Sequence, residues 1–298
     1  MIAASCSNES VNDVENAVEN VQVPVQVHVS DFSVSQEEFP SGSTRSGAAR
    51  GTTRAATDPA TYDGVKALTL AFYAGDGTEA FKTTQTKGAL EEGETFGEFA
   101  LSLPMGSYTM VVIGHGLNDG EPAVTVTSPT EATFGEYPAR ETFATTQTVN
   151  ITNASAVDIS ATLSRIIAKL RVVSTDGRAA NATNVRMSFA AGGKSFNPTT
   201  GLATIDTGFV NTVGISAAAG STSSSISYLF LTTDEQTMDV TIETLDEDGA
   251  VLFSKTVENV PFKRNRVTNL TGAMYTNNSV SGAFQIETEW EDQYDGTF

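Results

Sequence analysis

The chain contains few of the residues from which catalytic and metal centres are built. Its 298 residues include one cysteine and two histidines, so an internal disulfide and a zinc site made of cysteines are excluded. Tryptophan occurs once and aromatic residues make up 8% of the chain, which is little for lining a sugar-cleaving cleft even though carboxylates are plentiful. We therefore expect a protein that is not an enzyme and that binds no cofactor or metal.

Positive charge and long apolar runs are also scarce. Lys and Arg number 17 against 36 Asp and Glu, which gives a formal charge of −19, and this charge would repel nucleic acid and anionic lipid surfaces. No run approaches the roughly 20 apolar residues that a membrane-spanning helix needs, so any link to a membrane would be a lipid attachment. Apolar residues at 39% against 18% charged residues nevertheless predict folded cores.

The clearest pattern is a run of valines near the start of the chain. Val21, Val23, Val25, Val27 and Val29 alternate with other residues, which is the period of two that a half-buried β-strand shows. Pro24 has no N–H to donate, so we expect this strand at a sheet edge, or at least with one weakly bonded side. Such a strand would be comparatively easy to remove.

Most of the remaining chain consists of short apolar runs separated by turn residues, which predicts an all-β fold. Asp248-Gly249 between two such runs predicts a hairpin. One sandwich takes about 100 residues, so we expect two in tandem, residues 55–152 and 153–276. Residues 163–170 fit a helix face as well as a buried strand.

The two histidines offer little chemistry. His28 lies on the polar face of the valine strand, and His115 lies at a strand end with Asp119 and Glu121 close behind. A weak metal or acid–base site at His115 is conceivable. We favour a solvated turn histidine, because no second His or Cys nearby completes a metal set.

A polar segment follows the valine strand. Residues 40–59 are small and polar and carry Arg45, Arg50 and Arg54, a composition typical of exposed segments that proteases cut. Near the start, Cys6 follows Ala3-Ala4-Ser5 and precedes polar residues, which resembles the lipidation site of a bacterial lipoprotein. The alternative is a free thiol near a chain end.

A second alternating run lies at residues 284–290. Phe284, Ile286, Thr288 and Trp290 alternate with polar and acidic residues. This strand could complete the chain's own sandwich. It could equally fill a groove in another copy, where it would gain main-chain hydrogen bonds and side-chain pockets.

Four stretches, in this order and spacing, resemble the fimbrillin family, the pilins of type V pili of Gram-negative bacteria. They are Arg54 with the strand at 65–73, Leu103–Tyr108, Leu163–Leu170 and Lys263–Gly272. The resemblance implies two tandem transthyretin-like β-sandwiches, and it favours a strand over a helix at residues 163–173, as the start of the second domain.

The resemblance also implies a maturation route. Residues 1–54 would be a leader and propeptide, lipidated at Cys6 and carrying the removable strand Val21–Val29. An arginine-specific protease would cut after Arg54, with Arg50 and Arg45 as lesser candidates. Residues 277–298 would be a donor extension, with Phe284, Ile286 and Trp290 filling the vacated groove of a neighbouring copy.

The expected product is a subunit of a cell-surface fimbrium that supports adhesion and associates with its own copies and with other pilus subunits. Its precursor would be held at the outer membrane by lipid alone. The alternative is an accessory or tip adhesin, or a surface lipoprotein that binds a glycan or a host protein. For that alternative, the patch from His115 to Glu121 is the most obvious binding surface.

Overall fold

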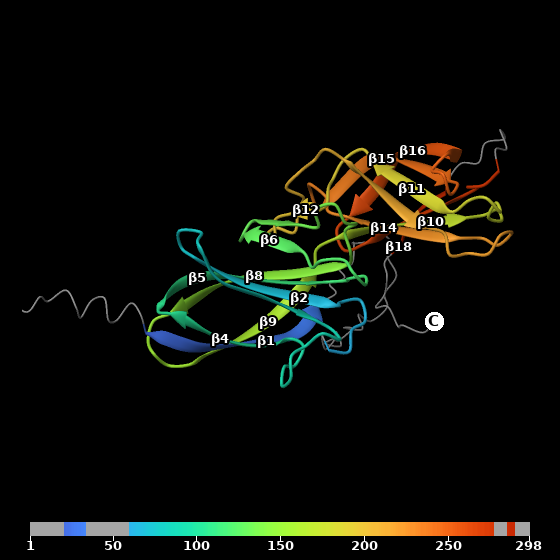
Figure 1. Ribbon diagram of the computed structural model, residues 1–298. Helices are drawn as coiled ribbons and strands as arrows, with labels where there is room; N and C mark the ends of the chain where they lie inside the picture. Colours follow the sequence, from blue (N-terminus) through green and yellow to red (C-terminus); the bar gives the residue numbers. More distant parts are fainter. Residues whose placement is uncertain (1–20, 34–59, 277–284, 290–298) are drawn as a thin grey trace, which may run out of the picture.

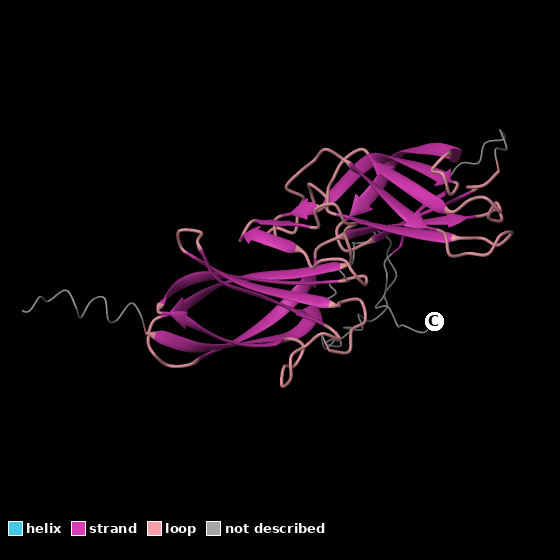
Figure 2. Ribbon diagram, viewed as in Figure 1, coloured by secondary structure: helices cyan, strands magenta, loops and turns pink. Residues whose placement is uncertain are grey.

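The computed structural model describes residues 21–33, 60–276 and 285–289, and these residues form strands and turns without any helix (Figure 2). The described part of the chain accordingly contains no helix that is long and apolar enough to cross a bilayer. Two β-sandwiches follow one another along the chain (Figure 1). The predicted all-β fold with two tandem sandwiches is confirmed.

The first sandwich is built from one strongly bent sheet of seven strands, in the order β3-β2-β5-β8-β9-β1-β4. Its strands are β1 (Gln22–Ser33), β2 (Ala67–Ala74), β3 (Glu79–Thr86), β4 (Glu98–Pro104), β5 (Gly106–His115), β8 (Thr142–Ile151) and β9 (Val157–Arg165). Strands β8 and β9 pair only at Phe143–Arg165 and Ala144–Ser164. The sheet turns at this corner, so β9, β1 and β4 form one layer and the other four strands form the second.

The second sandwich has two four-stranded sheets, ordered β14-β10-β17-β18 and β13-β11-β15-β16. The first sheet contains β10 (Ala168–Ser174), β14 (Ser224–Leu229), β17 (Val267–Gly272) and β18 (Gln285–Glu289). The second contains β11 (Asn184–Phe189), β13 (Phe209–Gly214), β15 (Glu235–Leu245) and β16 (Val251–Lys263). Residues 246–250 connect β15 to β16, and Gly249 in that turn has φ 81°, so the predicted hairpin is confirmed.

A small third sheet joins the two sandwiches. The hairpin of β6 (Thr125–Ser128) and β7 (Glu131–Thr133) leaves the first sandwich and pairs with β12 (Ser195–Phe196) of the second. Beneath it the rings of Phe196 and Phe230 stack with centroids 4.1 Å apart, and Phe134 packs on both. The two sandwiches therefore share an apolar core.

The expected domain boundary at residues 152/153 is wrong. Strand β9 pairs with β8 and β1 and so completes the first sandwich, and the second sandwich starts with β10. The predicted strand at 163–173 is two strands that belong to different sandwiches and meet at Ile166–Ile167. The sequence pattern did not reveal this break, because Ile166 and Ile167 are apolar and are buried in the shared core.

Candidate functional site: the slot occupied by strand β1

Strand β1 lies between two other strands, and both are paired with it from Val25 to His28. It pairs antiparallel with β4 from Gln22 to His28 and parallel with β9 from Val25 to Ser33. The expectation of an edge strand is therefore wrong. The weaker expectation of one poorly bonded side agrees with the register, because pairing with β9 begins only after Pro24, where a missing N–H costs least.

The valine face of β1 points into the core of the first sandwich. Val23, Val25 and Val27 are fully buried and Val29 is 4% exposed, whereas Val21, just before the strand, is 37% exposed. On the opposite face Gln22, Pro24 and Gln26 are exposed. The predicted half-buried strand is confirmed for four of the five valines.

The slot around these valines is apolar on every side. Flanking strands β4 and β9 contribute Phe99, Leu103, Ile159, Ala161 and Leu163 to the same buried cluster, and the facing layer contributes Leu68, Leu70, Phe72, Met110 and Val112. Burying one such side chain is worth roughly 1.5 to 3 kcal/mol, so four valines contribute about 6 to 12 kcal/mol. That is comparable to the whole stability of an ordinary domain, about 5 to 15 kcal/mol.

Polar contacts fix the register of β1 against its neighbour. The His28 ring contacts the Glu98 carboxylate at the surface, and the Val29 N–H donates to the carbonyl of Gly97 at 2.8 Å. A bulge between Val29 and Asp31 ends the regular alternation. These contacts hold the strand so that its valines, and not its glutamines, face inward.

Several residues singled out in the sequence lie outside the described part of the chain. These are Cys6, the three arginines Arg45, Arg50 and Arg54, and Phe284 and Trp290 of the expected donor strand. The connection from β1 to β2 runs through residues 34–66, so it includes all three arginines. A cut at any of them leaves β1 attached to the rest of the protein only by non-covalent contacts.

The other expected donor residue, Ile286, lies in β18. This strand pairs antiparallel with β17 at an edge of the second sandwich, and Ile286 is the register partner of Leu270. The chain is fixed just before this extension, where the Asp176 carboxylate accepts hydrogen bonds from the N–H groups of Met274, Tyr275 and Thr276 at 2.8 to 2.9 Å. Burial raises the pKa of Asp176, but these hydrogen bonds outweigh it and hold the pKa below its ordinary value.

The interpretation of His115 as a solvated turn residue is wrong. His115 is fully buried because β6, β7 and the loop before them cover the end of β5. Its Nε2 accepts from the Val124 N–H at 3.1 Å, and its Nδ1 lies 2.6 Å from the Gly116 carbonyl. Because Nε2 accepts a hydrogen bond it carries no proton, so the ring is neutral and acts as a structural hydrogen-bonding group, and burial lowers its pKa in the same sense.

The binding patch suggested from His115 to Glu121 does not present its histidine, because His115 is buried. Asp119 is exposed, and Glu121 pairs with Arg140 at 2.5 Å. Within the described residues, no group of three or more His, Cys, Asp or Glu side chains is placed to hold a metal ion.

Sequence reasoning missed a polar cluster where the sandwiches meet. Arg165 at the end of β9 pairs with Glu141 at 2.6 Å and donates to Asn265 of the second sandwich at 3.2 Å. Tyr62 donates to the same Glu141 at 2.8 Å, and burial, together with the Glu141 charge, raises the Tyr62 pKa. Arg165 and Asn265 lie in two of the stretches singled out in the sequence, but nothing local shows that they meet Tyr62 and Glu141, because the four residues come from separate segments.

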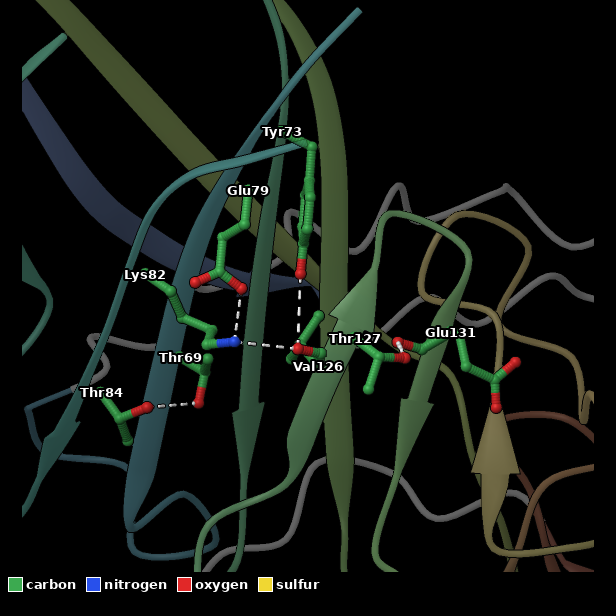
Figure 3. Close-up of polar contacts among 8 residues, drawn as sticks. All are labelled: Thr69, Tyr73, Glu79, Lys82, Thr84, Val126, Thr127 and Glu131. Carbon is green, nitrogen blue, oxygen red and sulfur yellow. Dashed lines mark hydrogen bonds and ion pairs between the residues drawn. The ribbon is translucent and has the colours of Figure 1, made fainter. Parts of the chain in front are cut away.

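The β6–β7 hairpin is itself tied to the outer face of the first sandwich (Figure 3). The Tyr73 hydroxyl and the Lys82 ammonium both donate to the carbonyl of Val126, at 3.4 and 3.2 Å, and Glu79 pairs with Lys82. Together with the apolar core beneath, these contacts join the hairpin to β2 and β3. The connection between the sandwiches is thus built from packed residues of both.

Comparisons with known proteins agree with this fold. A family model described as a family of unknown function, DUF6562, matches residues 25–297, and a comparison with curated proteins found no match. A candidate adhesin from Bacteroides ovatus shares 12% identity over 90% of this chain and 94% of its own, with a TM-score of 0.51.

Two further solved structures are similar at the same identity of 12%. The alignment with a candidate polysaccharide-binding protein from Bacteroides thetaiotaomicron covers 90% of this chain and 96% of that protein, with a TM-score of 0.50. The alignment with the fimbrial anchor protein Mfa2 from Porphyromonas gingivalis covers 90% of this chain and 98% of Mfa2, with a TM-score of 0.47. The matches with TM-scores of 0.50 and 0.51 show a common fold, and an identity of 12% shows nothing about shared chemistry.

Proposed function

The chain belongs to DUF6562, a family of unknown function, and we propose that it is a structural subunit of cell-surface fimbriae that supports adhesion. It would be made as a lipoprotein precursor, lipidated at Cys6 and held at the outer membrane. Proteolysis after Arg54, or after Arg50 or Arg45, would then activate it. The fold likeness to a candidate adhesin agrees with this role.

The observation that carries the proposal is the position of β1. The strand contributes four valines to the core of the first sandwich and lies between β4 and β9, yet one arginine-bearing connection is its only covalent link to the strands that follow. After a cut, loss of β1 would expose the slot and leave β4 and β9 with unpaired main-chain groups, a template for strand addition. The intact precursor cannot accept a strand because β1 fills the slot.

The same chain contains a segment that could act as the donor strand, because its apolar residues are spaced like the valines of β1. Phe284, Ile286, Thr288 and Trp290 have the same two-residue spacing as the four buried valines. Insertion of this strand into the next copy would restore both the apolar contacts and the ladder. Because such head-to-tail contacts do not close on themselves, they build a filament.

The mature subunit would remain soluble. Residues 1–54 contain seven acidic and three basic residues, so their removal leaves 29 acidic and 14 basic residues, a net charge of −15. A charge of this size keeps filaments solvated and opposes non-specific association.

Digestion of the purified chain with an arginine-specific protease tests the proposal. We expect a new N-terminus at Ala55 and a ladder of polymers on gels, both lost in Arg54→Ala if that site dominates. A chain lacking residues 281–298 is the matched control and should be trimmed without polymerising. Trimmed full-length protein that remains monomeric under all conditions would overturn the proposal.

A second candidate function is an accessory or tip adhesin, or a surface lipoprotein that binds a glycan or a host protein. The fold likeness to a candidate polysaccharide-binding protein favours it. Under this alternative the untrimmed monomer binds its ligand, and deletion of residues 281–298 leaves that binding unchanged.

A further inference from the structure

An open cleft of about 840 Å³ lies between the two sandwiches, and its walls carry more positive than negative charge. The basic side chains that line it are Arg165, Lys169, Arg171 and Arg266, and the acidic ones are Asp63 and Glu141. In a chain with a net charge of −19, this is a local excess of positive charge. Concave sites of one sign concentrate ligands of the opposite sign.

The acidic groups of the cleft are already engaged by basic residues. Glu141 pairs with Arg165 at 2.6 Å, and Asp63 lies 3.6 Å from the Lys66 ammonium. On β10, Arg171 donates to the hydroxyl of Ser224, a neutral partner, at 3.1 Å. The β10 wall thus presents positive charge to the cleft.

Strands β10, β17 and β18 are consecutive in one sheet, and their register places the C-terminal strand beside this wall. Val267 pairs with Lys169 on one side and with Glu289 on the other. One row further, Asn269 pairs with Arg171 and with Glu287. Acidic positions of β18 therefore occupy the same cross-strand rows as the two basic residues of β10.

Strand β18 also ends at the cleft. It runs antiparallel to β17, so its last residue, Glu289, lies opposite Val267, which lines the cleft. The residues that follow, Trp290–Phe298, contain Glu291, Asp292 and Asp295 and no Lys or Arg. Nine extended residues reach about 30 Å, which is ample to enter the cleft from its rim.

We propose that this basic cleft is the docking site of the chain's own acidic segment 290–298. The occupant is favoured by charge complementarity and by the place where β18 ends. The contact is electrostatic, so it weakens as salt shortens the Debye length to about 3 Å at 1 M. If the proposed strand donation is also right, the docked segment delays it, and this consequence alone rests on the proposed function.

Trp290 is the only tryptophan of the chain, so its fluorescence reports on the segment directly. We would measure quenching by acrylamide, a neutral quencher, in the full uncut chain at low salt and in 1 M NaCl. We expect quenching to be weak at low salt and to rise at high salt. In Lys169→Glu/Arg171→Glu, quenching at low salt should already equal the wild-type value at high salt.

Two further variants make the test specific. Lys255→Glu alters an exposed lysine on the other sheet and should leave quenching unchanged. Adding Glu291→Lys/Asp292→Lys to the β10 double variant swaps the charges and should restore protection. Restoration also shows that the two β10 substitutions are compatible with the folded state.

Three results would overturn the docking proposal. They are quenching that is independent of salt, protection that survives the β10 reversal, and protection that appears only as protein concentration rises, which would indicate another copy as the occupant. Because the assay uses uncut monomer and no polymerisation readout, its failure leaves the proposed fimbrial function untouched.

Discussion

Arg165 Nη2 lies 2.6 Å from Glu141 Oε1, and this pair closes the corner where the first sandwich leads into the second. The side chains are only 12% and 18% exposed, so removing one charge leaves the other poorly solvated. Breaking a fully buried pair costs roughly 3 to 5 kcal/mol, and we expect Glu141→Gln, in this nearly buried setting, to cost about 2 kcal/mol. Urea unfolding followed by circular dichroism measures the change.

The matched control for that pair is Glu235→Gln. Glu235 pairs with Lys263 at the same 2.6 Å, but its side chain is 59% exposed, and an exposed pair contributes at most about 1 kcal/mol. Equal losses of stability in the two variants would mean that burial at the corner adds nothing.

The two faces of β1 should respond differently to alanine. Val27 is fully buried and Gln26 is exposed. Val27→Ala removes two methyl groups from a packed core and should cost about 2 kcal/mol, whereas Gln26→Ala should stay within about 0.5 kcal/mol. Thermal or urea unfolding of the uncut chain distinguishes them, and a larger effect at Gln26 would contradict the inward orientation of the valines.

Buried His115 makes stability fall in mild acid. Burial lowers its pKa below the ordinary 6.5, the nearby Arg140 charge lowers it further, and the Gly116 carbonyl and Glu121 oppose the shift. The unfolded chain therefore takes up the proton first, so stability declines as the pH falls below about 6.5 until the folded pKa is passed. Well above pH 6.5 this histidine is neutral in both states and contributes no pH dependence.

The variant that tests this is His115→Gln. Its free energy of unfolding should fall less between pH 7.5 and pH 5.5 than that of the wild type, although it starts lower because the contact with Val124 changes. His28→Gln, at the surface, should keep the His115-dependent loss. Parallel pH profiles for wild type and His115→Gln would show that the buried ring is not responsible.

Local patterns in the sequence predicted the strands well. The valine alternation predicts β1 because side chains along a strand point alternately to opposite faces. Asp248-Gly249 predicts the β15–β16 hairpin because such a tight turn needs a residue that adopts a positive φ, as Gly249 does. Both are properties of a few consecutive residues. Neither requires knowledge of what the strand packs against.

Pairing over long distances could not be predicted in the same way. The parallel contact between β1 and β9 joins residues more than 130 positions apart, and it decides both the central place of β1 and the domain boundary. Likewise His115 reads as exposed until the β6–β7 hairpin is placed over it. The cluster of Tyr62, Glu141, Arg165 and Asn265 depends on the final arrangement of both sandwiches.

We propose that β1 fills a slot that a second strand with the same alternation of apolar side chains can occupy. The most direct measurement is strand exchange on protein cut after Arg54 and ending at Thr276, with a fluorescent peptide of residues 281–293 as the incoming strand. We predict that the peptide binds the cut protein, that fragment 1–54 is released in step, and that uncut protein and a scrambled peptide show neither effect. Retention of fragment 1–54 with no peptide binding would contradict the account.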